Sequence, residues 1–248
     1  MGGIILQYRE LGKTDKQVSI VGLGCEHLDN KPYEQIKDVI DAALSYGVNI
    51  LDVFMPGKEI RENIAKALGS NRGGIMIQGH IGSTDVNQQY DISRDIPAVK
   101  RSFEDMLRIF GGYIDFGMMF FIDSENDYKN VFETEFADYV QHLKQEGCIG
   151  HIGFSSHNPI TAMKAIETGL PEMMLFSINP AFDILPSDLY WIRIIVNKGM
   201  SSIEQTFMRM NITPWSFHPI FSATVGSVQK AIINQESSDG GIIVIYGF

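Results

Sequence analysis

Short hydrophobic runs alternate along the chain with longer segments in which apolar residues recur every three or four positions. In residues 31–47, for example, Ile36, Val39 and Ile40 fall on one helical face and Gly47 ends the segment. This alternation predicts buried strands followed by amphipathic helices. The predicted strands are 18–24, 48–54, 74–82, 113–123, 148–157 and 172–181, and the predicted helices are 31–47, 57–70, 95–112, 127–147 and 158–170.

Strands that are apolar along their whole length, each followed by a helix, indicate a parallel sheet covered by helices. The stretch GLGCEH, residues 22–27, lacks the full spacing of a dinucleotide-binding fingerprint. The succession of units therefore favours an α/β fold of the (β/α)8 TIM-barrel type over a doubly wound sheet. The length of 248 residues agrees with the roughly 250 residues that such a barrel usually takes.

The pattern weakens after residue 186. We therefore divide the chain into a barrel, residues 1–186, and an atypical segment, residues 187–248, that either completes the barrel or reflects its truncation. Within that segment, 190–196 and 240–248 are candidate strands, 202–210 is a candidate short helix, and 211–227 shows no clear period. An incomplete barrel would leave a strand edge open to pairing with another chain, and the sequence does not decide between a monomer and a homo-oligomer.

Charge and composition narrow the classes of partner. The net charge of -10 argues against nucleic acid, which needs clustered Lys and Arg. No apolar run approaches the roughly 20 residues of a membrane helix, and the N-terminus does not resemble a signal peptide. The two cysteines, Cys25 and Cys148, are too few for a disulfide scaffold. We therefore expect a cytoplasmic protein with reduced thiols, with no nucleic-acid or membrane partner.

Functional residues of a barrel collect where its strands end, at the C-terminal face. Structural roles are also open to some of these residues: Asp52 could cap the following helix, and His80 could be a partly buried, hydrogen-bonded histidine. Asn158, before Pro159, suits the start of a helix. The candidate site residues are Glu26, His27, Asp52, Met55, His80, Phe120, Ser155, Ser156, His157, Ser177 and Asn179.

Two kinds of chemistry suit these side chains. A carboxylate such as Asp52 beside the imidazole of His80 can fix its tautomer and favour its protonated form, which gives a general acid near neutral pH. Asp52, His80 and His157 could instead bind a metal ion and serve a metal-dependent hydrolase. Because the local spacing matches no metal motif, we place no metal in the predicted site.

Several stretches resemble the aldo-keto reductase family. YRELGKTDKQVSIVGLGCE, residues 8–26, resembles its opening, in which a short hairpin closes the barrel floor, and 113–123, 151–159 and 175–186 resemble its fourth, fifth and sixth strands. IMIQGHIGST, residues 75–84, is most similar to the branch that often carries a C-terminal iron–sulfur segment. The cysteines of that segment are absent, so no cluster is implied. The resemblance covers residues 4–186.

This resemblance implies a barrel that binds NADP or NAD and reduces a small-molecule aldehyde or ketone. The family's catalytic residues are Asp, Tyr, Lys and His, and only the first is present, as Asp52. The tyrosine is missing from FMPG, residues 54–57, while His80 takes the lysine position and Phe120 the histidine position. The resemblance assigns cofactor binding to Ser155, Ser156 and Ser177. Their positions at or just after the strand ends add Asn179 to the cofactor site and place Glu26, His27, Met55 and Phe120 in the substrate pocket.

Three functions follow from these observations. The first is an aldo-keto reductase with altered or weakened catalysis, in which His80, polarised by Asp52, replaces the missing proton donor. The second is a non-catalytic relative that binds a cofactor or a partner. The third is the metal-dependent hydrolase that would use Asp52, His80 and His157. A measurement of carbonyl turnover would distinguish the first function from the second, and a metal-binding assay would distinguish the third from both.

Overall fold

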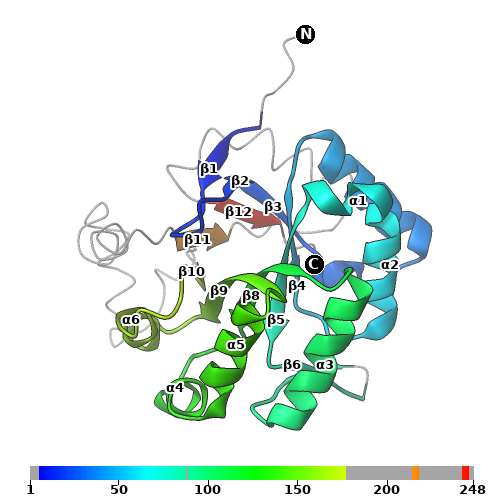
Figure 1. Ribbon diagram of the computed structural model, residues 1–248. Helices are drawn as coiled ribbons and strands as arrows, with labels where there is room; N and C mark the ends of the chain where they lie inside the picture. Colours follow the sequence, from blue (N-terminus) through cyan, green and yellow to red (C-terminus); the bar gives the residue numbers. More distant parts are fainter. Residues whose placement is uncertain (1–5, 88, 177–213, 218–241, 246–248) are drawn as a thin grey trace, which may run out of the picture.

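The computed structural model describes residues 6–87, 89–176, 214–217 and 242–245. Its central feature is a closed barrel of eight strands, all paired in parallel, in the order β10-β11-β12-β3-β4-β5-β8-β9 (Figure 1). The strands are β3 (Val21–Gly24), β4 (Ile50–Val53), β5 (Met76–Ile81), β8 (Ile114–Met119), β9 (Ile149–Ser156), β10 (Met173–Phe176), β11 (Pro214–Phe217) and β12 (Ile242–Ile245). The predicted barrel fold is confirmed.

Helices follow strands β3, β4, β5, β8 and β9 along the chain and lie on the outside of this part of the barrel, as the sequence pattern predicts (Figure 1). The apolar faces of the helices are buried: in α3, for example, Val99, Phe103 and Met106 are almost fully buried. The helices are α1 (Tyr33–Ser45), α2 (Lys58–Leu68), α3 (Ile96–Ile109), α4 (Glu125–Phe132), α5 (Glu135–Gln145) and α6 (Pro159–Glu167), with short 3-10 helices η1 (Glu26–Leu28) and η2 (Gly69–Gly74). No helix in the described part of the chain is long and apolar enough to cross a membrane.

Three elements differ from the sequence prediction. The single helix expected over 127–147 is two helices, because Thr134 caps α5 by accepting a hydrogen bond from the amide of Phe136. A strand, β11, lies within residues 211–227, where the sequence shows no period. A hairpin of β6 (Ser83–Val86) and β7 (Gln89–Ile92) follows β5 and was not predicted. The candidate strand 240–248 contains β12, whereas 190–196 and 202–210 lie outside the described residues.

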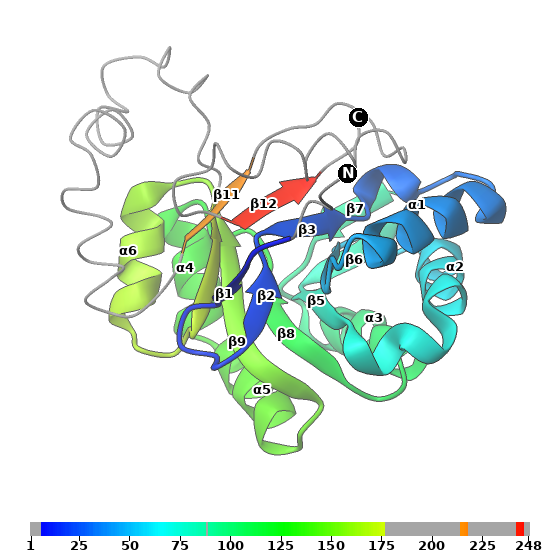
Figure 2. The ribbon, with the colours of Figure 1, turned by 90° about the horizontal axis from the view of Figure 1, so that it is seen from above.

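A second hairpin, of β1 (Tyr8–Glu10) and β2 (Gln17–Ser19), closes the N-terminal end of the barrel, as the resemblance implied. Its turn reaches the start of β10, where the amide of Lys13 donates to the carbonyl oxygen of Glu172 at 3.0 Å. Figure 2 views the molecule from this end, with the hairpin in front of the barrel strands. The opposite, C-terminal end of the strands carries the candidate site residues Asp52, His80, Ser155 and Ser156.

The N-terminal end owes part of its stability to Glu172. Its carboxylate binds Lys144, the imidazole of His151 at 2.9 Å and the amide of Ile152 at 3.0 Å. Burial alone would raise the pKa of Glu172, but the hydrogen bonds from His151, Lys144 and the Ile152 amide outweigh it and lower the pKa to about 2. The ionised form is therefore favoured in the folded protein.

This lowered pKa predicts a dependence of stability on pH. Glu172 should stabilise the fold fully above the pKa of an unfolded glutamate, about 4.3, and lose that contribution as the pH falls toward 2. After allowance for solvent screening, we expect about 1–2 kcal/mol. Urea unfolding of wild type and Glu172→Gln at pH 6.5 and 3 measures it: the difference between the two should shrink at pH 3. An equal difference at both values would contradict the assignment.

Candidate functional site

Asp52 lies near the end of β4, in a strand whose four residues are all buried. Only 1% of Asp52 is exposed. Its neighbour in the register of β5 is Gln78, so that the two side chains lie side by side inside the barrel. A buried carboxylate is costly unless hydrogen bonds compensate for the lost water. The structure provides such bonds to Asp52. Asp52 does not cap the following helix, because α2 begins at Lys58 without a side-chain cap.

His80 follows Gln78 by two residues on β5, and both face the barrel interior because side chains alternate along a strand. His80 Nε2 lies 2.7 Å from Asp52 Oδ1, and Gln78 Nε2 donates to the same oxygen at 2.7 Å. All three side chains are at least 98% buried. The predicted partnership of Asp52 and His80 is therefore present, and Gln78 is a third member that the sequence analysis missed.

Two polar atoms of this group are left without a hydrogen-bond partner among the described residues: His80 Nδ1 and Gln78 Oε1. An ionised carboxylate only accepts hydrogen bonds, so His80 Nε2 carries the hydrogen and Nδ1 is the nitrogen available to another molecule. Buried polar atoms usually have partners, and those that do not call for an explanation. Here they point to a site for a small polar group beside Nδ1.

Aromatic rings surround His80. Phe54, directly after β4, and Phe120, directly after β8, lie in edge-to-face contact with the imidazole, at 6.0 and 5.2 Å between ring centroids. Tyr90 of the β6–β7 hairpin contacts the same two rings, Phe54 at 5.1 Å and Phe120 at 6.0 Å. We refer to Phe54, Phe120 and Tyr90 as the aromatic wall. It makes the surroundings of His80 apolar.

The remaining predicted pocket residues lie on the segments that follow β3 and β4. Glu26 and His27 form the start of η1. Burial raises the pKa of Glu26, and the charge of Asp52 raises it further. Burial lowers the pKa of His27, and the positive charge of Lys31 lowers it further. Met55 is 4% exposed, and its carbonyl oxygen accepts a hydrogen bond from Arg61 Nε at 2.7 Å, which fixes the segment after β4.

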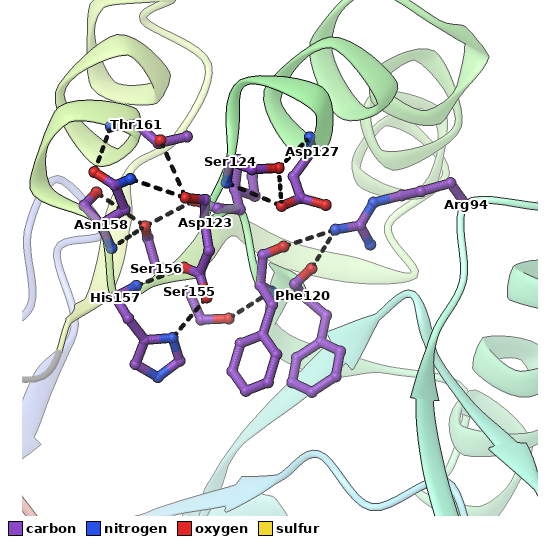
Figure 3. A network of polar contacts seen from close by, with 12 residues as sticks. Arg94, Phe120, Asp123, Ser124, Asp127, Ser155, Ser156, His157, Asn158 and Thr161 are labelled. Atoms are coloured by element: carbon purple, nitrogen blue, oxygen red, sulfur yellow. Dashed lines mark hydrogen bonds and ion pairs between the residues drawn. The ribbon is translucent and has the colours of Figure 1, made fainter.

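Ser155 and Ser156 end β9 and hold the neighbouring segment after β8 (Figure 3). Ser155 Oγ accepts from the amide of Phe121 at 2.9 Å, and Ser156 Oγ donates to the carbonyl oxygen of Ile122 at 2.7 Å. The hydroxyl hydrogen of Ser155 has no acceptor among the described residues, whereas that of Ser156 is engaged. Ser155 is therefore the serine that can still donate to a ligand. Ser177 and Asn179 lie outside the described residues.

His157 is not part of the Asp52–His80 group. Its Nδ1 lies 2.8 Å from Asp123 Oδ2, and its amide donates to Asp123 Oδ1 at 2.6 Å (Figure 3). Burial would raise the pKa of Asp123, but the hydrogen bonds from His157 outweigh it and lower the pKa. Within residues 6–87, 89–176 and the two short strands, no three His, Cys, Asp or Glu side chains are placed to hold a metal ion. The metal site of the hydrolase hypothesis does not assemble there.

Asn158 has the capping role that the sequence predicted as one alternative. Its side-chain oxygen accepts from the amides of Ile160 at 2.9 Å and Thr161 at 3.4 Å, and α6 begins at the next residue. Its Nδ2 donates to the carbonyl oxygen of Asp123 at 3.0 Å (Figure 3). The SSHNP stretch thus has a structural role in its second half, while Ser155 remains available to a ligand.

Three contributors to the site were not predicted from the sequence: Gln78, Tyr90 and Arg94. The alternation of Gln78 and His80 along β5 was a signal, since residues two apart face the same side of a strand. Tyr90 gave no signal, because the hairpin that carries it was not predicted. Arg94 donates to the carbonyl oxygens of Phe120 and Phe121 through Nη2, at 2.6 and 2.8 Å (Figure 3), a contact between segments that are remote in sequence.

Comparison with known proteins agrees with this geometry. Residues 21–193 match the model of the aldo/keto reductase family. A protein from Bacillus subtilis (strain 168), named "Uncharacterized oxidoreductase YqkF", is 24% identical over 218 residues, which are 81% of this chain and 64% of that protein. The chain thus spans less than two thirds of that relative's length.

Solved structures show the same fold. An aldo-keto reductase from Bacillus halodurans in its holo form has a TM-score of 0.69 and 17% identity, with 96% of this chain and 85% of that one covered. An aldo/keto reductase from Brucella melitensis has a TM-score of 0.61 and 16% identity, with 97% and 88% covered. The closed parallel barrel defines the fold class, and the match to the family model identifies the family. The chain belongs to the aldo/keto reductase family.

Proposed function

We propose that this protein is a nicotinamide-dependent carbonyl oxidoreductase in which His80, held by Asp52, is the proton donor. The observation that carries the proposal is the buried contact of 2.7 Å between His80 Nε2 and Asp52 Oδ1, which leaves Nδ1 without a partner among the described residues. The substrate is a small aldehyde or ketone, and the cofactor is NADPH or NADH.

The chain's own residues would perform the proton transfer. A carbonyl that accepts a hydride develops negative charge on its oxygen, and that charge is costly in the apolar surroundings of Phe54 and Phe120 without a donor. With His80 as an imidazolium, Nδ1 donates its proton to that oxygen, and the ring remains bound to Asp52 through Nε2–H. In the reverse direction, neutral His80 accepts the proton of an alcohol at Nδ1. Asp52 fixes the ring in the orientation that both directions need, and Gln78 holds the carboxylate of Asp52 in place.

Ser155 supports a cofactor site at the end of β9. A bound nicotinamide would supply the hydride, and the hydroxyl of Ser155 has a hydrogen free to bind its carboxamide. Ser156 would act indirectly, since its hydroxyl already holds the segment after β8. Ser177 and Asn179 remain proposed cofactor ligands on the sequence alone. Iron–sulfur chemistry is not part of the proposal.

A fluorescence titration with NADPH, followed by carbonyl turnover, tests the proposed function. Saturable binding at micromolar concentrations together with reduction of an aldehyde would support it. A folded protein that binds no nicotinamide cofactor would contradict it.

Replacing Ser155 provides a prediction about the cofactor site. Ser155→Ala should weaken NADPH binding about fivefold to tenfold, the size of one lost hydrogen bond. The exposed Ser45 of α1 offers a matched control, and Ser45→Ala should leave the affinity unchanged. NADPH fluorescence gives both dissociation constants. Equal affinities for wild type and Ser155→Ala would remove Ser155 from the cofactor site.

A second candidate function is that of a non-catalytic family member, which binds the nicotinamide cofactor but does not reduce a carbonyl substrate. The observation in its favour is the covering of His80, which is 2% exposed beneath Phe120, itself 1% exposed. In that case NADPH would bind with the same affinity, and no aldehyde would be reduced. The binding and turnover halves of the experiment separate the two functions.

A further inference from the structure

The aromatic wall has two fixed members. Phe120 is held at both of its backbone polar groups: its amide donates to the carbonyl oxygen of Ile81 at 3.0 Å, and its carbonyl oxygen accepts from Arg94 at 2.6 Å (Figure 3). The carbonyl oxygen of Phe54 accepts from Ser83 Oγ at 2.6 Å. These two rings are stacked at 5.7 Å between centroids. The inner part of the wall is therefore preorganised.

Tyr90 is the outer member of the wall and is carried by the β6–β7 hairpin. The base of that hairpin is anchored, since the amide of Ser93 donates to the carbonyl oxygen of Gly82 at 2.8 Å and Ser102 Oγ donates to that of Ser83 at 2.8 Å. Tyr90 itself is 46% exposed, whereas Phe54 is 7% exposed. One side of Tyr90 therefore faces solvent, and the other side contacts Phe54 and Phe120.

The chemistry of the wall restricts what can lie against it. Three aromatic rings offer π faces and edges, which favour a second aromatic ring over a saturated group of equal size. Phe54 and Phe120 provide no side-chain hydrogen-bonding group, so the hydroxyls of a sugar or polyol placed against these two rings would lose water contacts that the rings do not replace. The polar atom that the described residues leave open next to these rings is His80 Nδ1, which matches one oxygen.

We infer that the substrate carries an aromatic ring close to its carbonyl group, and that Tyr90 is the residue that determines this preference. The inference rests on the proposed function. The ring of the substrate packs against the aromatic wall and places the carbonyl oxygen at His80 Nδ1. His80 donates the proton from Nδ1 to the carbonyl oxygen, and a bound reduced nicotinamide would supply the hydride to the carbonyl carbon, so that the products would be the alcohol and the oxidised cofactor.

The test compares two aldehydes of the same shape, phenylacetaldehyde and cyclohexylacetaldehyde, in neither of which is the carbonyl conjugated to the ring. Wild type should have the higher kcat/KM for the aromatic aldehyde. Tyr90→Leu should reduce the ratio of the two kcat/KM values about threefold to tenfold, the range expected for one lost aromatic pair. Tyr90→Phe keeps the ring and should preserve the ratio. Tyr8→Leu is a matched control, because Tyr8 is also 46% exposed but lies at the opposite end of the barrel.

A binding measurement separates this inference from the proposed function. The product alcohols, 2-phenylethanol and 2-cyclohexylethanol, are titrated calorimetrically into wild type and Tyr90→Leu with NADP present. If the protein reduces the aldehydes and Tyr90→Leu leaves the ratio of the two kcat/KM values unchanged, the inference is overturned and the proposed function stands. If wild type binds the aromatic alcohol more tightly, Tyr90→Leu loses this preference, and no aldehyde is reduced, the aromatic site is supported and the proposed chemistry is overturned. Neither turnover nor aromatic preference would overturn both.

Discussion

Replacing His80 by glutamine should lower kcat for aldehyde reduction by about 10²–10⁴-fold, the usual effect of removing a general acid. Glutamine retains polar atoms that can reach Asp52 but has no proton to transfer to the developing alkoxide. The affinity for NADPH should stay within about threefold of wild type, since His80 is not assigned to the cofactor site. Steady-state kinetics with saturating NADPH, alongside the fluorescence titration, measure both quantities.

Retained affinity for NADPH distinguishes this prediction from misfolding, because a variant that fails to fold would lose cofactor binding as well. His142→Gln, on the exposed side of α5, serves as the control. Unchanged turnover in His80→Gln would refute the assignment of His80 as proton donor.

Replacing Arg94 by alanine should destabilise the protein by about 2–4 kcal/mol. The guanidinium holds two carbonyl oxygens, those of Phe120 and Phe121, and Phe121 has a φ of 45°, a left-handed conformation that bulky residues rarely adopt. Burial lowers the pKa of Arg94 to about 10 against the opposing charges of Asp127 and Asp123, so it remains charged at neutral pH. Its loss would leave two partly buried carbonyl groups unpaired and the strained turn unsupported.

Urea unfolding at pH 7 measures this destabilisation. Arg94→Lys should recover only part of the stability, because an ammonium group lacks the planar fork of a guanidinium. Arg101→Ala, on the exposed face of α3, is the matched control and should change the free energy of unfolding by less than about 0.5 kcal/mol. A variant Arg94→Ala as stable as Arg101→Ala would show that the turn after β8 holds its shape without the guanidinium.

These two expected effects meet at Phe120. His80 contacts its ring, and Arg94 binds its backbone oxygen, so that one residue connects the proton donor with the turn that shapes the site. The position that resembles the family's catalytic histidine is thus occupied by a residue that packs against His80 instead of binding substrate through a polar atom. Loss of Arg94 should therefore also reduce the preference for an aromatic aldehyde.

Local periodicity along the chain accounts for the order and type of most elements. Continuous apolar runs such as ILDV at 50–53 are buried on both sides, and the helical stripes recur at the spacing of an α-helix, so the pattern alone was sufficient to predict them. The same pattern placed Asp52 and His80 near the ends of consecutive strands, which made the carboxylate and the candidate proton donor a predictable pair. The break between α4 and α5 was missed, because a capping threonine interrupts the helix without a proline or glycine to mark it.

The assembly of the site depends on contacts that local periodicity does not encode. The register of β4 against β5 places Gln78 beside Asp52, the β6–β7 hairpin brings Tyr90 to Phe54, and Arg94 reaches the turn after β8 from another segment. Each is a contact between residues far apart in the chain, and strand pairing and packing determine it. A sequence pattern indicates which residues face the interior of a barrel, whereas the closing of the barrel decides which of them touch.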